Sequence, residues 1–64
     1  MYYWIELGFI VELLDITKNT VTYRYSYYGL KRKEKTTNLL IAENGKKFFW
    51  ADNTQVFLNQ CSIG

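Results

Sequence analysis

The chain contains no histidine, no proline and only one cysteine, Cys61. Without histidine, the commonest general base and the commonest metal ligand are both missing. A single thiol forms neither an intramolecular disulfide nor a zinc site. No phosphate-binding loop, dinucleotide-binding motif or nucleophile elbow occurs. These absences predict a chain that is not an enzyme and that needs no metal and no cofactor.

Long apolar runs and strong net charge are absent as well. The apolar opening segment, 1–14, is interrupted by Glu6 and Glu12, and no basic segment precedes it. We therefore expect neither a signal peptide nor a membrane span. The lack of disulfides favours an intracellular, cytoplasmic setting. A net charge of +2 is too small to imply a nucleic-acid partner by itself.

Aromatic side chains are what the chain has in excess. It carries six Tyr, four Phe and two Trp among 64 residues, a length that allows one domain, 1–64. A core of this size does not easily hide so many rings, each of which buries roughly 150–250 Å². Some rings should be exposed, and contiguous exposed rings mark interaction sites.

The first segment, 2–16, alternates with a period of two, which is typical of a strand. Its odd positions from 3 to 13 are all apolar, which predicts one continuous buried face. Gly8 predicts a bulge or bend within it. On an extended strand, Glu6 and Glu12 share a face but lie about 20 Å apart. That separation is too long for a glycosidase pair, which needs roughly 5–9.5 Å.

The second strand, 20–28, follows a turn at 17–19. Two registers compete, one with a two-residue loop and one with a three-residue loop that places Asn19 in the left-handed region. We prefer the three-residue loop because it pairs apolar residues with apolar residues and sets Glu12 opposite Arg24. It also sets Leu13 opposite Tyr23.

The second half of the chain holds a basic loop at 29–35, a strand at 36–43 and the turn residues Asn44 and Gly45. A type I′ turn at Asn44 and Gly45 predicts a hairpin with both faces apolar, in which Leu40 lies beside Phe49. Residues 52–55 fit a helix capping box, so we expect one helical or 3₁₀ turn leading into a short strand near Phe57.

Four or five short antiparallel strands joined by tight turns indicate an all-β fold closed as a small β-barrel. The order and lengths of the elements resemble an SH3-like barrel first and an OB-like barrel second. This resemblance is one of architecture, and no family motif accompanies it.

Our leading functional hypothesis is a non-catalytic module that binds nucleic acid through a basic loop and exposed tyrosines. Phosphates attract lysine and arginine, and bases stack on aromatic rings. Lys46 and Lys47 extend this site only if the two hairpin ends lie on one side. The predicted contact residues are Arg24, Tyr28, Lys31, Arg32, Lys33, Lys35, Lys46 and Lys47.

The alternative is a protein-binding inhibitor or adaptor that uses an exposed aromatic and aliphatic sheet face, either on a larger protein complex or as a homodimer. This alternative includes a mobile-element or phage origin, on the ground of length alone. Its predicted contacts are Trp4, Leu40, Phe49 and Trp50. Cys61 has no basic neighbour in sequence, so we predict a packing role rather than reactivity.

Overall fold

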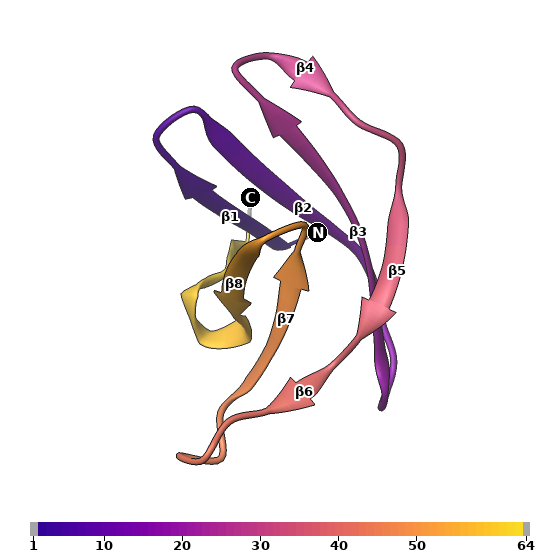
Figure 1. The fold of residues 1–64 in the computed structure, drawn as a ribbon, viewed down its shortest axis with the longest axis vertical. Coiled ribbons are helices and arrows are strands. Elements are labelled where there is room, and N and C mark those ends of the chain that lie inside the picture. Colours follow the sequence, from indigo (N-terminus) through magenta and orange to yellow (C-terminus); the bar gives the residue numbers. More distant parts are fainter. Residues whose placement is uncertain (1, 64) are drawn as a thin grey trace.

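A computed structural model describes residues 2–63, which form two antiparallel sheets (Figure 1). The larger sheet has the order β4-β3-β2-β1-β9, and β5 pairs with β3 along the same edge as β4. The smaller sheet has the order β6-β7-β8. The elements are β1 (Tyr2–Glu6), β2 (Phe9–Ile16), β3 (Thr20–Tyr27), β4 (Leu30–Lys31), β5 (Lys35–Asn38), β6 (Leu40–Ile41), β7 (Lys47–Ala51), β8 (Thr54–Phe57), the 3₁₀ turn η1 (Leu58–Gln60) and β9 (Ser62–Ile63).

The all-β prediction is confirmed, and the described strands form two antiparallel sheets. Between Tyr2 and Ile63, no helix has the length and apolar content needed to cross a membrane.

The core lies where the smaller sheet packs against the inner face of the larger sheet. The ring of Tyr23 on β3 lies 5.5 Å from that of Phe49 on β7, measured between centroids. Because side chains alternate along a strand, β2 places Val11 and Leu13 in this core and β3 places Val21 and Tyr23 there, as their sequences predict. The buried side chains are Val11, Leu13, Val21, Tyr23, Phe49, Ala51 and Val56.

The prediction of one long strand is wrong, because the first segment is a hairpin: the chain reverses direction at Gly8, where we expected a bulge or bend. Leu7 and Gly8 form a tight turn, and Glu6 pairs with Phe9. The backbone of Gly8 has a positive φ of 73°, which glycine adopts without steric cost. This turn moves Trp4 to the core side and leaves Ile5 and Leu7 exposed.

The preferred register between β2 and β3 is confirmed, with Leu13 opposite Tyr23 and Glu12 opposite Arg24. The loop differs from the prediction, because the register shifts by one residue between Leu13 and Asp15. Asn19 is not in the left-handed region. Instead, the Thr17 hydroxyl accepts a hydrogen bond of 2.9 Å from the N–H of Thr20. The predicted register therefore results from a bulge in β2 and not from the three-residue loop that we expected.

The strand predicted at 36–43 is divided between the two sheets. β5 pairs with β3, whereas β6 pairs with β7. Between them, the Leu39 N–H donates a hydrogen bond of 2.8 Å to the Asn19 carbonyl. This single residue carries the chain from one sheet to the other.

The turn at Gly45 gives a register that is one residue away from the prediction. Of the two predicted turn residues, Gly45 has a positive φ of 82° and Asn44 does not. The Gly45 N–H donates a hydrogen bond of 2.9 Å to the Ala42 carbonyl. This three-residue loop sets Leu40 opposite Phe48. A slip of one residue exchanges the two faces of a strand, so Phe49 lies in the core.

The capping box predicted at 52–55 is also wrong. Asp52 lies in the turn between β7 and β8, with a positive φ of 55°, and Gln55 belongs to β8. The short turn predicted near the C-terminus is η1, which follows the strand instead of preceding it. The Phe57 N–H donates a hydrogen bond of 3.3 Å to the Gln60 side chain across this turn.

Candidate functional site

Exposed apolar side chains gather where the β1–β2 and β3–β4 hairpins turn, at the top of Figure 1. The exposed fraction is 91% for Leu7, 69% for Ile5, 68% for Tyr28 and 42% for Ile10. These four residues line a shallow hollow of about 500 Å³ together with the backbone of Gly8 and Gly29. We call Ile5, Leu7, Ile10 and Tyr28 the hairpin-tip surface.

Two tight turns support this surface by packing against each other. Tyr28 and Gly29 both have positive φ, of 49° and 84°, as a type I′ turn requires. The Tyr28 N–H donates a hydrogen bond of 2.8 Å to the Gly8 carbonyl. The Tyr28 ring covers Gly8 so closely that a Cβ there would lie 2.5 Å from its Cζ. Gly8 therefore serves both the turn and the contact between hairpins.

Beside the hairpin-tip surface, the inner face of the larger sheet carries a row of aromatic rings. Phe9 lies 6.0 Å from Trp4, 5.3 Å from Tyr25 and 6.2 Å from Tyr27, between ring centroids. Tyr27 then meets Tyr28 edge to face at 4.6 Å. The apolar surface at the tip is thus continuous with the aromatic packing of the core.

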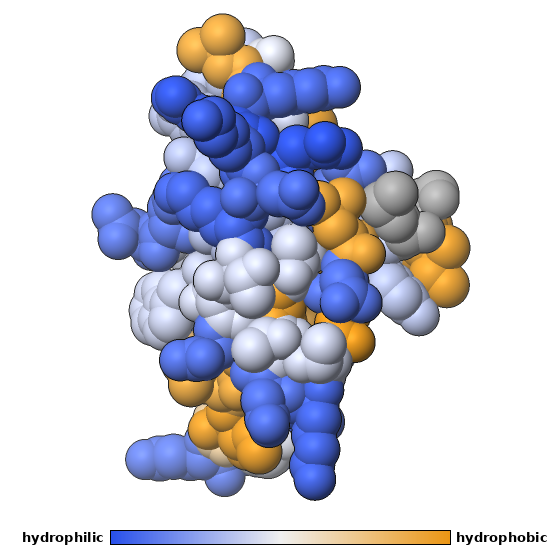
Figure 2. Space-filling view, turned by 90° about the vertical axis from the view of Figure 1, so that its right-hand side faces the viewer, coloured by the Kyte–Doolittle hydropathy of each residue, from blue (hydrophilic) through white to orange (hydrophobic). Residues whose placement is uncertain are grey.

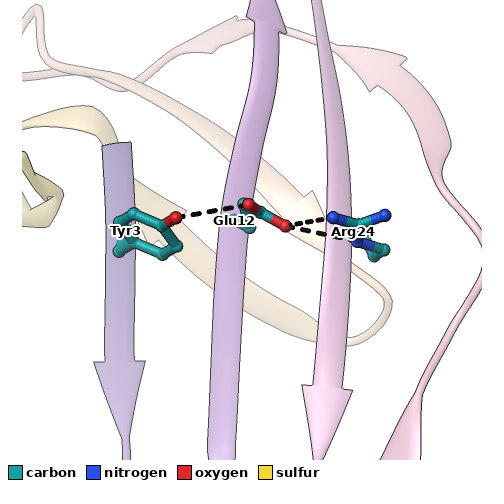
Figure 3. A network of polar contacts seen from close by, with 3 residues as sticks. All are labelled: Tyr3, Glu12 and Arg24. Carbon is teal, nitrogen blue, oxygen red and sulfur yellow. Dashed lines mark hydrogen bonds and ion pairs between the residues drawn. The ribbon is translucent and has the colours of Figure 1, made fainter. Parts of the chain in front are cut away.

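The outer face of the larger sheet carries a polar network across three strands (Figure 3). The Arg24 guanidinium donates a hydrogen bond of 2.6 Å to the Glu12 carboxylate, and the Tyr3 hydroxyl donates one of 3.3 Å to the other oxygen. The hydrogen bond from Arg24 holds the pKa of Glu12 below its ordinary value. The charge of Arg24 is therefore largely matched within the chain.

A second polar cluster lies where β5 approaches the turn between β7 and β8. Lys35 Nζ lies 2.7 Å from the Asp52 carboxylate and 5.6 Å from the centroid of the Tyr25 ring. Through hydrogen bonds, Asp52 raises the pKa of both Lys35 and Tyr25, and its own pKa is lowered by Lys35 and Tyr25. The Asp52 N–H donates a hydrogen bond of 3.1 Å to the Tyr23 hydroxyl. This cluster ties the two sheets together.

The basic segment predicted to contact nucleic acid does not form one continuous site. Lys31 lies opposite Ser26 on the outer face, where its charge reaches Glu12. Arg32 and Lys35 lie on the side of Tyr25 and Asp52. Figure 2 looks onto β4 and β5 and shows hydrophilic side chains over the upper half of this side, with hydrophobic atoms above them. The exposed Lys33 follows Arg32 between β4 and β5.

Lys46 and Lys47 do not extend this basic segment. They lie at the β6–β7 hairpin, which is at the bottom of Figure 1, whereas β4 is at the top. We included these two lysines only if the two hairpin ends lie on one side of the molecule. The two ends lie on opposite sides, so this condition is not met.

The structure divides the residues predicted for a protein interface. Phe49 is fully buried, so it is not available to a partner in the folded chain. Phe48 takes the outer position, where its ring lies 6.2 Å from that of Trp50, and Leu40 pairs with it. Leu40 and Trp50 remain partly exposed, while Trp4 packs against the core.

Glu6 and Glu12 lie on opposite faces, because the hairpin reverses the face on which even-numbered residues lie. Cys61 packs against the core, and burial raises the pKa of its thiol. Among residues 2–63, no group of three or more His, Cys, Asp or Glu side chains is placed to hold a metal ion.

Comparison of the chain with protein-family models, with curated proteins and with solved structures found no match.

Sequence reasoning missed Ile5, Leu7 and Ile10 because it assigned the first segment to one strand. The sequence does contain a signal for the hairpin, which is the cross-strand pairing it would give. Folding the segment at Leu7 and Gly8 sets Ile5 opposite Ile10, and such apolar pairs stabilise a hairpin.

Proposed function

We propose that the chain is a non-catalytic binding module that docks a protein partner on the hairpin-tip surface. The observation that carries this proposal is the exposure of Leu7, which is 91% exposed in a tight turn. A leucine at such a position adds almost nothing to folding, because its side chain stays in water. Together with Ile5 and Tyr28, it forms the kind of exposed apolar surface that marks interaction sites.

The charges around this surface support a protein partner over a nucleic acid. Phosphate binding needs several cations that are free to replace counterions. Arg24 and Lys35 are each paired with a carboxylate, and Lys31 lies near Glu12 on a different face from Arg32. This arrangement leaves Arg32 and Lys33 beside Glu34, which is a weak site for phosphates.

An SH3-like small barrel remains part of this proposal. It is supported by the pairing of the first strand, β1, with the last strand, β9, and by the packing of two short antiparallel sheets around one core. On such a scaffold, ligand contacts are carried by turns and exposed faces, while the core supplies rigidity.

The experiment is selection of displayed random peptides on the immobilised protein, with Leu7→Asp and Ile41→Asp as matched variants. Ile41 is 70% exposed at the opposite hairpin, so both variants add one charge at an exposed aliphatic position. Selected peptides should bind the wild type and Ile41→Asp equally, and Leu7→Asp at least about tenfold more weakly. Equal binding to all three proteins would contradict docking at the hairpin-tip surface.

A parallel measurement tests the nucleic-acid hypothesis. A fluorescent single-stranded oligonucleotide is titrated with the protein at low salt, and the titration is repeated at higher salt. Binding that weakens steeply with salt and is lost in the variant Arg32→Glu would favour nucleic acid over a protein partner.

A further inference from the structure

The edge of β1 beside the hairpin-tip surface has no strand partner over half of its length. β9 pairs with Tyr2 and Tyr3 only, so within residues 2–63 no strand lies beside Trp4–Glu6 on this edge. Unpaired strand edges invite pairing with another chain, and proteins usually block them with charged side chains, proline or a bulge. Trp4–Glu6 contains no lysine, no proline and no register shift, and its one charge, Glu6, restricts the partner to a strand that carries a cation opposite it.

The register shows which backbone groups point to this open edge. Leu7 and Gly8 form a two-residue turn, so Glu6 and Phe9 are the closing pair that exchanges hydrogen bonds. Bonding alternates along an antiparallel ladder, so Trp4 also bonds to β2 and Ile5 does not. The N–H and C=O of Ile5 therefore point away from β2, to the edge that β9 leaves open.

The side chains at this edge indicate what a partner strand should carry. Ile5 is 69% exposed on the outer face, next to Ile10. Glu6 lies on the opposite face, is exposed, and takes part in neither of the two ion pairs found among residues 2–63. An apolar residue suits the position opposite Ile5, and a cation suits the neighbouring position opposite Glu6.

We propose that the partner is an extended peptide segment that adds a strand to β1 at Ile5, with an apolar residue adjacent to a lysine or arginine. Main-chain hydrogen bonds at a sheet edge supply affinity, and alternate side chains supply specificity. This inference rests on the proposed function and names the chemistry of its partner. The hairpin-tip surface then continues the contact beyond the end of β1.

The test uses chemical synthesis of the chain with an N-methyl group on the amide of Ile5. The modification removes one donor and leaves the side chain unchanged. It does not touch the β1–β2 ladder, because this N–H points away from β2. An N-methyl group on Lys33 is the control, since that N–H donates no hydrogen bond between residues 2 and 63. Circular dichroism and thermal melting establish that both modified chains fold.

Peptides selected from the random library are the probe. They should bind N-methyl-Ile5 protein at least about tenfold more weakly than the wild type and N-methyl-Lys33 protein. Hydrogen exchange of the Ile5 amide, followed by NMR, should slow on peptide binding. Selection on Glu6→Lys should replace the basic residue beside the apolar anchor with an acidic one.

Three results would overturn the inference, and they are distinguishable. Equal binding to N-methyl-Ile5 protein, with binding still lost in Leu7→Asp, removes the strand addition and leaves the proposed function standing. The absence of any selected peptide overturns both. Self-association of the wild type that N-methylation of Ile5 abolishes assigns the edge to a second copy of this chain instead of a foreign peptide.

Discussion

Phe49 and Leu7 are both large apolar side chains, but Phe49 is fully buried between the two sheets and Leu7 is 91% exposed at a turn. Around Phe49, residues from β2, β3, β7 and β8 share one core. Around Leu7, the apolar residues surround an open hollow. The end of the molecule where the sheets meet holds the fold together, and the end where the hairpins turn leaves its apolar side chains exposed. Composition alone does not separate these two uses of the same residue types.

The largest effect is expected at the packed end, for Phe49→Ala. Removing a buried phenylalanine side chain costs about 3–5 kcal/mol, because it loses transfer free energy and leaves a cavity. A chain of 64 residues has a total stability of roughly 3–10 kcal/mol at the usual amount per residue. The variant should therefore lose about a third or more of its stability, as measured by circular dichroism and urea titration. A change below about 1 kcal/mol would mean that Phe49 is not a core residue.

Gly8→Ala tests the junction between the two ends and should have the next largest effect. A methyl group there meets both a positive φ and the Tyr28 ring, so we expect a loss of about 1–2 kcal/mol. In the background of Tyr28→Ala the ring contact is gone, and the loss should be smaller. This double-mutant cycle, measured by urea titration, separates backbone strain from the contact between the hairpins. Equal losses in the two backgrounds would show that the ring does not restrict Gly8.

The Asp52 and Lys35 pair gives a smaller effect that depends on pH. The pKa of Asp52 is lowered from 3.8 in the folded state, so its stabilising effect is present above that pH and is lost as the pH falls through the folded pKa. The pKa of Lys35 is raised from 10.5, so its effect is present below that pH and is lost as the pH rises through the folded pKa.

Asp52→Asn should therefore be less stable than the wild type near neutral pH, and the difference should shrink below about pH 3.8 and above about pH 10.5. Asparagine tolerates the positive φ at this position, so the turn is preserved. Thermal melting of both proteins across the pH range checks this. Glu12 is present in both proteins and cancels in the difference. A difference that does not vary with pH would show that the ion pair contributes nothing.

Leu7→Ala should have the smallest effect on the free energy of unfolding, within about 0.5 kcal/mol. The Leu7 side chain is already almost fully exposed to water, so its truncation removes almost no buried apolar area. The same variant should weaken binding of selected peptides. This outcome would sharpen the contrast with Phe49, since one residue would serve stability and the other binding. A loss of stability comparable to that of Gly8→Ala would place Leu7 in the fold instead, and urea titration distinguishes the two.

Within a single strand, the alternation of the sequence decided which side chains share a face. It predicted the all-β class, the inner positions of β2 and β3, and the pairing of Glu12 with Arg24 across them. These predictions hold because side chains two residues apart lie on one side of a sheet, whatever surrounds them.

Where the chain turns, only the tertiary structure decided the outcome. In the first segment, the chain forms a hairpin whose turn residue Gly8 packs against the Tyr28 ring. This hairpin exposes Ile5 and Leu7. The loop at Gly45 exchanges the sides of Phe48 and Phe49. A turn that is one residue longer or shorter reverses the face of everything after it. The sequence therefore determined the strands, and contacts between turns far apart in the chain determined which apolar residues stay exposed.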